Sequence, residues 1–225
     1  MCVVFFDLDG TLLDHQTAER EAASVLHRSI APSSNCNFEE FCRAWHIAHE
    51  KFFRLYLNGA ISFQEQRRAR IREVSGKHLT DQVADDLFSN YLAAYESSWR
   101  LYPDVIDCLE SLEENTLGVI TNGNGIQQRK KLERLGLSRW FRFIVTSEDV
   151  GYAKPAHQIF HAACNQAAVH PATTFYVGDH FESDAVAAQS AGLIGIWLNR
   201  AGESREPCHV HEIRTLNALP KLVKQ

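Results

Sequence analysis

Residues 3–14 read Val-Val-Phe-Phe-Asp-Leu-Asp-Gly-Thr-Leu-Leu-Asp, an apolar run that ends in two carboxylates one residue apart. Such a run is typical of a buried parallel strand, and the acids stand where this strand would leave the sheet. Because side chains alternate along an extended chain, Asp7 and Asp9 can face one pocket. Gly10 permits a sharp turn after the strand, and Thr11 supplies a hydroxyl for that turn. The stretch therefore predicts a reactive strand end with Asp7 and Asp9 as its catalytic pair.

Two negative charges this close repel each other, so a buried pair needs a compensating partner. A divalent cation with oxygen ligands would keep both acids ionised, and Mg²⁺ is the simplest candidate. The alternative is a strand end whose two acids are solvated or cap a helix.

Length and composition favour a folded enzyme-sized chain over a nucleic-acid or membrane protein. The 225 residues are 45% hydrophobic and carry a net charge of −5, without the basic face that a nucleic-acid polymer requires. No apolar run approaches the roughly 20 residues that cross a bilayer, and no charged leader precedes the first strand. We expect a cytoplasmic protein, monomeric or homodimeric, that contacts neither nucleic acid nor membrane.

Cysteine and histidine spacing gives little support for disulfides or structural zinc. The six cysteines are scattered without a Cys-x-x-Cys pair, which indicates reduced thiols. Three histidine pairs have metal-like spacing, but none has a third ligand at a comparable spacing, so we expect no zinc site. These pairs are His46 with His49, His157 with His161, and His209 with His211.

Helical periodicity fills the chain from residue 15 to residue 99. Helices are predicted over 17–30, 37–58, 62–75 and 80–98, and no strand pattern interrupts them. Four arginines in the third of these helices, at positions 67, 68, 70 and 72, are interpreted as a solvated face. The block predicts an inserted all-helical domain over 15–99.

Strand and helix patterns alternate from residue 100 onward. Helices over 103–114, 125–136, 155–168 and 182–191 precede strands over 117–121, 143–146, 174–177 and 194–198. Repeated units of this kind predict a parallel sheet with right-handed crossovers. Residues 1–14 and 100–225 are therefore expected to form a Rossmann-like α/β core of five parallel strands with helices on both faces. Residues 203–211 read as a polar loop.

Ligands of such sheets bind beyond the carboxyl ends of the strands, and there the chain places a consistent polar set. The set comprises Asp7 and Asp9, Thr121-Asn122-Gly123, Lys154 before Pro155, and Asp179 with Asp184. Four carboxylates, a hydroxyl and an ammonium in one crevice are the mixture that phosphoryl transfer through a carboxylate nucleophile requires.

Each member of the set has an expected role. Asp7 would attack phosphorus, and Asp9 would protonate the leaving alkoxide and later take a proton from water. Phosphoryl oxygens would be bound by the Thr121 hydroxyl and by the backbone amides of Asn122 and Gly123. Lys154 would hold Asp7 and the transferring group. The metal ligands would be Asp7, Asp9, Asp179 and Asp184, where Asp184 either binds the metal itself or orders a bound water.

Four segments together resemble the motifs of the haloacid dehalogenase-like hydrolase superfamily, and they span the chain outside the helical block. They are Asp7-Leu8-Asp9-Gly10-Thr11, Thr121-Asn122-Gly123, Lys154-Pro155 and Gly178-Asp179-x4-Asp184. The resemblance implies a Rossmann-like core, Mg²⁺, phosphatase activity on a small phosphorylated metabolite, and a metal ligand from the Asp9 backbone carbonyl. It also implies that the helical block is a cap over the substrate.

Finer similarity points to the subgroup that includes pyrimidine 5′-nucleotidases. The segments that carry this similarity are 58–61, 120–123 with Gln127 or Gln128, 147–151, 182–184 and 197–200. Related capped members hydrolyse phosphoglycolate or sugar phosphates, so these substrates remain an alternative.

Other functions are compatible with parts of the pattern. A phospho-receiver domain uses similar groups, but it is about half this length and its acid follows a middle strand. A silent binding protein would be expected to lack Asp7, Asp9 or Lys154, and a phosphosugar mutase remains open. The dehalogenase branch typically lacks the second acid and needs no metal, so Asp9, Asp179 and Asp184 together argue against it.

Overall fold

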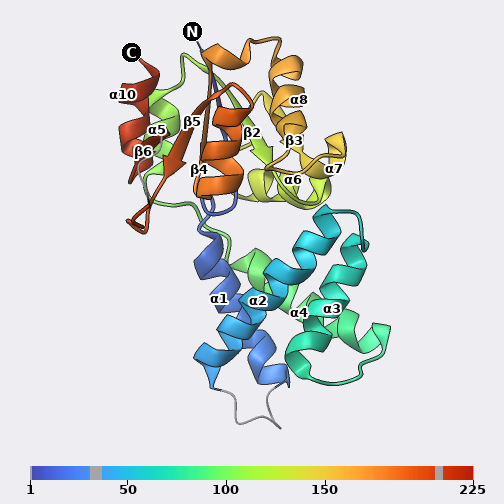
Figure 1. Ribbon diagram of the computed structural model, residues 1–225. Coiled ribbons are helices and arrows are strands. Elements are labelled where there is room, and N and C mark those ends of the chain that lie inside the picture. Colours follow the sequence, from blue (N-terminus) through green and yellow to red (C-terminus); the bar gives the residue numbers. More distant parts are fainter. Residues whose placement is uncertain (1, 31–36, 206–209, 225) are drawn as a thin grey trace. The chain divides into compact units, whose positions relative to one another are not determined.

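The structure is a computed structural model that describes residues 2–30, 37–205 and 210–224. The chain divides into two compact units, one formed by residues 1–14 with 100–225 and the other by residues 15–99 (Figure 1). Each unit has its own hydrophobic core, and each is described separately below.

The first unit is built on a parallel sheet, which confirms the predicted α/β class. Six strands lie in the order β3-β2-β1-β4-β5-β6, and every neighbouring pair is parallel. Their bounds are β1 Val3–Phe6, β2 Thr116–Thr121, β3 Phe143–Thr146, β4 Thr174–Gly178, β5 Ile194–Leu198 and β6 His211–Ile213. The sheet places β1 between β2 and β4, so the ends of these three strands are neighbours.

The prediction of five strands was one short. The additional strand, β6, has only three residues and begins at His211, the last residue of the segment read as a polar loop; residues 206–209 lie outside the described residues. Its sequence is His-Glu-Ile, and only Ile213 is buried. Because an edge strand with one buried side chain lacks an apolar run, hydrophobic patterning does not reveal it.

Helices cover both faces of this sheet. In Figure 1, α5 and α10 lie on the side of the strands opposite α8. The α8 face has a core in which Val3 and Phe5 of β1 pack with residues of α8 and α9, as alternation along a strand requires. Helix bounds in this unit are α5 Val105–Ser111, α6 Gly125–Arg134, α7 Ser147–Val150, α8 His157–Ala167, α9 Ala187–Ser190 and α10 Leu219–Val223. The remaining helical segments are the 3₁₀ turns η2 Pro171–Thr173 and η4 Leu216–Ala218 and the π-helical segment η3 Phe181–Val186.

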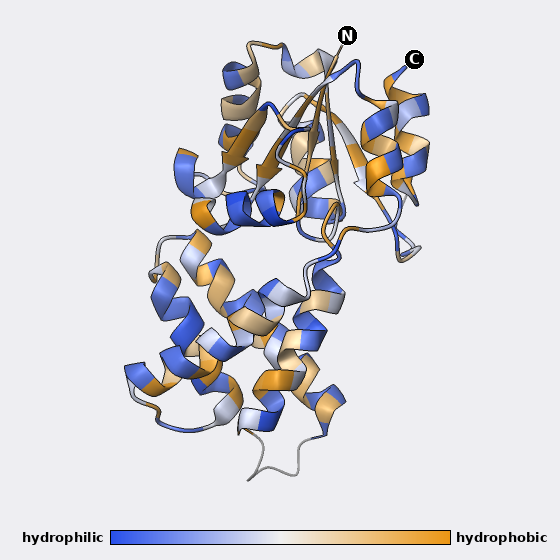
Figure 2. Cartoon of the chain, turned by 180° about the vertical axis from the view of Figure 1, so that it is seen from behind, coloured by the Kyte–Doolittle hydropathy of each residue, from blue (hydrophilic) through white to orange (hydrophobic). Residues whose placement is uncertain are grey.

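In the described residues of the second unit, 15–30 and 37–99, four helices are present, close to the predicted ranges. They are α1 His15–Ile30, α2 Phe38–Leu57, α3 Phe63–Ser75 and α4 Asp81–Ser97. Capping boxes begin α2 at Asn37 and α3 at Ser62, which explains why these two starts could be read from the sequence. Figure 2 shows hydrophobic and hydrophilic residues alternating along these helices, as amphipathic packing requires.

One arginine of the run in α3 is buried, contrary to the prediction of a solvated face. Arg70 is 5% exposed, and its guanidinium lies 4.2 Å from the ring centroid of Trp45 in the helical core. A planar, weakly hydrated guanidinium can stack on an aromatic ring, which charge patterning alone does not reveal.

The helical unit is inserted where two segments of the first unit lie side by side. The amide of Asp14 donates to the carbonyl of Arg100 at 3.0 Å, and the amide of Tyr102 donates to the carbonyl of Leu12 at 3.1 Å. The chain therefore leaves the α/β unit and re-enters it at adjacent backbone positions. Among the described residues, no helix has the length and apolar character needed to cross a membrane.

Candidate active site

Three adjacent strand ends bring the predicted catalytic segments to one edge of the sheet. In the ladder, Phe6 of β1 pairs with Val119 of β2 and Val177 of β4. Asp7 follows β1, and its amide donates to the Val177 carbonyl at 2.9 Å, which continues the ladder by one step. Since the strands are parallel, the residues that follow them, including Asp179, emerge at the same edge.

Lys154 is the centre of a buried polar cluster at this edge. Its ammonium donates to Asp7 Oδ1 at 2.7 Å, to Asp184 Oδ1 at 2.6 Å and to the Tyr176 hydroxyl at 2.8 Å. Both carboxylates and Lys154 are at most 6% exposed. The three bonds satisfy all three ammonium hydrogens, so Lys154 has one well-defined position.

Burial and crowding of acids shift the pKa values of the cluster. Burial, followed by repulsion from Asp184 and Asp179, holds the pKa of Asp7 well above its ordinary value although Lys154 acts against the shift. Burial and Asp184 raise the pKa of Asp179 to about 6. Burial alone would lower the pKa of Lys154, but attraction to Asp184 and Asp7 outweighs it and the pKa is raised. The single positive charge of Lys154 is therefore insufficient to keep all of these acids ionised, and additional positive charge would stabilise their ionised forms.

The same acids fit a divalent cation. Carboxylate oxygens of Asp7, Asp179 and Asp184 lie within 4.8 Å of one another. A Cβ at Gly10 would come within 2.3 Å of Asp179 Oδ2, and one at Gly178 within 2.4 Å of Asp184 Oδ2 and Cγ, so both carboxylates occupy space that only glycine leaves. Three carboxylates with no nitrogen or sulfur donor match the ligand preference of Mg²⁺.

Hydrogen bonds outside this group fix two of the carboxylates. The Thr11 hydroxyl donates to Asp179 Oδ1 at 3.0 Å, and the amide of His180 donates to Asp184 Oδ2 at 3.0 Å. The indole of Trp197 donates to the Asp179 carbonyl at 3.0 Å. Such partners orient the oxygens that would face a cation.

Asp9 takes a different position from the one that strand alternation predicts for its side chain. Both of its oxygens accept from the Lys131 ammonium, at 2.7 and 2.6 Å, and Oδ2 also accepts from Gln128 Nε2 at 2.9 Å. Its carboxylate is not part of the close group formed by Asp7, Asp179 and Asp184. The two neighbouring acids are thus held by two different lysines.

The Thr121-Asn122-Gly123 segment anchors Lys154. Asn122 donates through Nδ2 to the Lys154 carbonyl at 3.0 Å and accepts from the Lys154 amide at 2.8 Å. Thr121 is 1% exposed, and its hydroxyl accepts from Gln128 Nε2 at 2.7 Å. The amide of Gly123, expected to bind phosphate, donates instead to the Ser147 hydroxyl at 2.8 Å.

Tyr176, Gln128, Lys131 and Ser147 belong to the site but were not predicted to. Tyr176 lies inside β4, where an aromatic residue reads as core. Gln128 and Lys131 lie three positions apart on α6, so they share a helix face; this spacing, and the subgroup similarity that includes Gln127 or Gln128 and 147–151, were the signals that the sequence offered.

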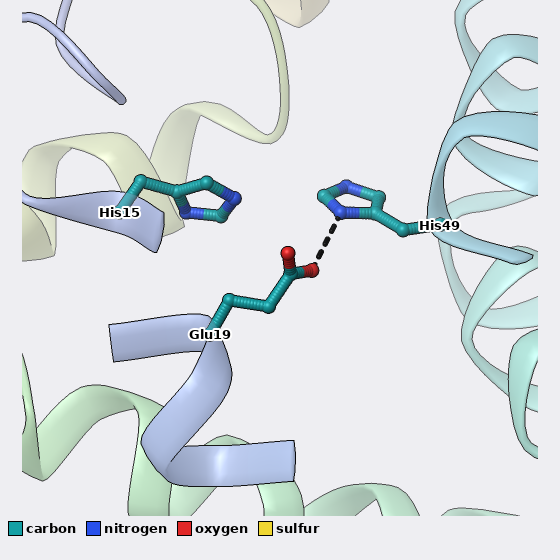
Figure 3. A group of neighbouring side chains, drawn as sticks. All are labelled: His15, Glu19 and His49. Atoms are coloured by element: carbon teal, nitrogen blue, oxygen red, sulfur yellow. Dashed lines mark hydrogen bonds and ion pairs between the residues drawn. The ribbon is translucent and has the colours of Figure 1, made fainter. Parts of the chain in front are cut away.

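A second polar cluster lies inside the helical unit (Figure 3). His15 and Glu19 of α1 and His49 of α2 point toward one another, and His49 Nδ1 bonds Glu19 Oε1 at 2.9 Å. This cluster contains only His49 of the His46–His49 pair; its other two donors, His15 and Glu19, come from α1. Arg70 Nη2, 3.7 Å from Glu19 Oε1, and His46 Nδ1, 3.6 Å from Oε2, already compensate the carboxylate. We therefore interpret the cluster as a structural network.

This network predicts acid sensitivity of the helical unit. Burial, then Arg70, lowers the pKa of His49 from 6.5 to about 4. Between these two values the unfolded chain binds a proton that the folded chain does not, so stability falls as pH decreases from about 6.5 to 4, by at most about 1.4 kcal/mol per pH unit. Glu19, whose pKa stays well below normal because bonds from His46 and His49 outweigh burial, extends the loss below pH 4.5.

Thermal unfolding followed by circular dichroism across pH 4–7.5 measures this effect. His49→Gln keeps a donor for Glu19 but cannot titrate, so its unfolding temperature should vary less with pH. His46, whose pKa the bond to Glu19 raises, acts in the opposite direction in both proteins and cancels in the comparison. Equal pH slopes for the two proteins would contradict the assignment.

Comparison with known proteins agrees with the geometry of the first unit. Residues 1–192 match the profile of the haloacid dehalogenase-like hydrolase family. The pyrimidine 5′-nucleotidase YjjG of Escherichia coli K12 is 29% identical over 97% of this chain and 95% of its own. A glyceraldehyde 3-phosphate phosphatase of Methanothermobacter thermautotrophicus is also 29% identical, over 93% of this chain and 90% of its own.

Among solved structures, the magnesium-bound HAD-hydrolase YfnB of Bacillus subtilis superposes with a TM-score of 0.81. The match covers 100% of this chain and 99% of that chain at 25% identity. The family profile, the relatives that match over nearly their whole length and the fold all indicate the same group of proteins. The chain belongs to the haloacid dehalogenase-like hydrolases.

Proposed function

We propose that the chain is a Mg²⁺-dependent phosphomonoester hydrolase that works through an aspartyl-phosphate on Asp7. The observation that carries this proposal is the buried Asp7 carboxylate, held at 2.7 Å by Lys154 in a close group with Asp179 and Asp184. A carboxylate with a fixed cation beside it, next to a site for a second cation, is suited to attack an anionic phosphate.

In the first step, a carboxylate oxygen of Asp7 forms a bond to phosphorus while the bond from phosphorus to the alcohol oxygen breaks. Asp9, when protonated, gives its proton to that departing oxygen. Lys154 neutralises charge on Asp7 and on the transferring group. Asp7, Asp179, Asp184 and the Asp9 carbonyl would hold Mg²⁺, which would screen the repulsion between nucleophile and phosphate.

In the second step, water attacks the same phosphorus and Asp9 takes its proton. The bond between phosphorus and Asp7 breaks, inorganic phosphate leaves, and both acids return to their starting forms. The Thr121 hydroxyl and the Asn122 amide are suited to bind phosphoryl oxygens in both steps. The Gly123 amide has no such role in this proposal, because it donates to Ser147.

We propose nucleoside 5′-monophosphates as the substrate class. Similarity to a pyrimidine 5′-nucleotidase over nearly the whole chain supports this choice. Sugar phosphates or phosphoglycolate are the second candidate class of substrate. A glyceraldehyde 3-phosphate phosphatase supports this class, since its sequence identity to this chain is also 29%. We further propose that the helical unit, residues 15–99, is a cap that selects the substrate and that Trp99-Arg100 forms part of its hinge.

Metal removal and a substrate panel test the proposal. The expected result is release of inorganic phosphate from nucleoside 5′-monophosphates with Mg²⁺, loss of this activity with a chelator, and recovery when Mg²⁺ is added back. Phosphoglycolate and hexose phosphates serve as comparison substrates, and a hexose bisphosphate activator detects a mutase. Hydrolysis of a 2-haloacid without metal, or no turnover of any phosphomonoester, would contradict the proposal.

Asp9→Asn is expected to slow both chemical steps, by about 10²-fold or more, because it removes the acid of the first and the base of the second. With p-nitrophenyl phosphate, whose leaving group needs little protonation, the first step is spared and phosphoenzyme should accumulate. Acid quenching followed by mass spectrometry of the peptide that contains Asp7 detects it. Kinetics equal to those of the unmodified chain would reject both roles of Asp9.

A further inference from the structure

Helix α6 buries polar residues where a helix packed on a sheet ordinarily buries apolar ones. Its buried residues are Gly125, Gln128, Lys131 and Leu132. Figure 2 draws this helix largely in the hydrophilic colour. Lys131 is 4% exposed and Gln128 is 2% exposed. A buried lysine and a buried glutamine are costly unless they are paired, so their partners identify what they are for.

The partner of Lys131 is the second acid of the Asp7-Leu8-Asp9 segment. Lys131 Nζ lies 2.7 and 2.6 Å from the two oxygens of Asp9, and the Lys131 side chain is 5% exposed against 25% for Asp9. Contact with both oxygens fixes the plane of the carboxyl group as well as its position. Lys154 and Lys131 thus divide the two acids between them.

Gln128 connects this ion pair to the group proposed to bind phosphate. Its Nε2 lies 2.7 Å from Thr121 Oγ1, 2.9 Å from Asp9 Oδ2 and 3.2 Å from the Asn122 carbonyl. An amide nitrogen has two hydrogens, and the two nearest acceptors belong to Thr121 and Asp9. Because Thr121 Oγ1 accepts from Gln128, its own hydrogen points elsewhere, and the bond that it donates to the Asn122 carbonyl is long, at 3.4 Å. The hydroxyl is therefore available as a donor.

We propose that Lys131 and Gln128 are positioning residues for proton transfer and phosphate binding. Lys131 keeps the Asp9 carboxyl group at one place and in one plane. Gln128 fixes the separation between Asp9 and Thr121, and its bond to Thr121 Oγ1 leaves the Thr121 hydroxyl hydrogen to be donated to a phosphoryl oxygen. This inference rests on the proposed function, since it assigns the two side chains a role in the steps that Asp9 and Thr121 carry out. A displacement of about 1 Å in a group that transfers a proton can cost about 10²-fold in rate.

Lys131→Met and Gln128→Leu test the proposal, with matched controls on the same helix. Lys130→Met and Gln127→Leu remove the same groups one position away; Lys130 is exposed and Gln127 is partly exposed. With an alkyl phosphate such as a nucleoside monophosphate, Lys131→Met should lower kcat by about 10- to 100-fold with little change in KM. Gln128→Leu should lower kcat and raise KM, because Thr121 also loses its orientation. Both controls should stay within about twofold.

Stopped-flow kinetics with p-nitrophenyl phosphate provide a readout that a purely structural role would not change. Misplacing Asp9 spares loss of nitrophenolate but slows attack by water. Lys131→Met should therefore release nitrophenolate in a burst that is larger than that of the unmodified chain, followed by a slower steady rate. In an Asp9→Asn background, Lys131→Met should add little, since it acts through Asp9.

The outcomes separate this inference from the function on which it rests. If the unmodified chain has no Mg²⁺-dependent turnover, the proposed function and this inference fall together. If it turns over but Lys131→Met gives no enlarged burst, or costs as much in the Asp9→Asn background, only the inference is overturned. Lys131→Arg keeps the buried charge with a different donor geometry, so it gives the same test, with a smaller burst expected, if the methionine variant does not fold.

Discussion

Replacing Asp7 by asparagine is expected to abolish turnover, to below about one thousandth of the original rate, and to leave the fold intact. The variant has no carboxylate at the end of β1 that can accept phosphorus, since the other acid held by Lys154, Asp184, belongs to η3. Steady-state release of phosphate measures the loss, and acid quenching should detect no phosphorylated peptide. Asp107→Asn, an exposed acid on α5, is the control and should keep full activity.

Stability should move in the opposite direction from activity in this variant. Burial holds the pKa of Asp7 well above its ordinary value, so the ionised form is unfavourable in the folded state and asparagine relieves it. Lys154 retains Asp184 and Tyr176 as partners. The unfolding temperature in the absence of Mg²⁺ should be equal or higher. A rate of phosphate release by Asp7→Asn above about one tenth of that of the unmodified chain would contradict the role of Asp7 as the nucleophile.

Replacing Lys154 by methionine is expected to cost about 3–5 kcal/mol of stability as well as activity. The ammonium is buried between Asp7 and Asp184, and its removal leaves two buried carboxylates without their cation. A change of this size corresponds to a decrease of about 6–20 °C in unfolding temperature for a unit of this length. Because the chain has two compact units, the transition of the α/β unit should shift while that of the helical unit stays in place.

Added Mg²⁺ distinguishes this account from a simple packing defect. A cation bound by Asp7, Asp179 and Asp184 would replace part of the lost positive charge, so it should recover more stability in Lys154→Met than in the unmodified chain. Lys221→Met, an exposed lysine on α10, serves as the matched control and should change stability by less than about 0.5 kcal/mol. A loss under about 1 kcal/mol in Lys154→Met would contradict the proposed role of this ion pair.

The sequence predicted the strands that carry buried apolar runs and the polar residues that follow them. It predicted β1 because Val3–Phe6 is an unbroken apolar run, and all four of these residues are buried. It missed β6 because His-Glu-Ile has no such run, and only Ile213 is buried there. The four helices of residues 15–99 could be read from apolar periodicity and from capping residues. Local physical rules decide these features, so local sequence reveals them.

Features that depend on contacts between distant segments were missed. Strand alternation predicts that Asp7 and Asp9 face one pocket, but Lys131, 122 positions further along the chain, holds the Asp9 carboxylate outside the close group of Asp7, Asp179 and Asp184, where it shares the Gln128 amide with Thr121. Ser147 likewise takes the amide of Gly123 across 24 positions. A hydrogen-bond partner that comes from a distant part of the chain produces no periodic pattern in the sequence around the residue that it contacts. These parts of the site are therefore set by the tertiary structure and not by local sequence.

The adjacency of Asp14 and Arg100 has a consequence for how such proteins diversify. Because one hydrogen bond of 3.0 Å joins the point where the chain departs to the point where it returns, the intervening 85 residues can be exchanged without changing the path of β1 or its neighbours. With the cap role proposed for this unit, new substrate preferences can then evolve by replacement of a module, while the acids and lysines at the strand ends stay under a separate and stricter selection.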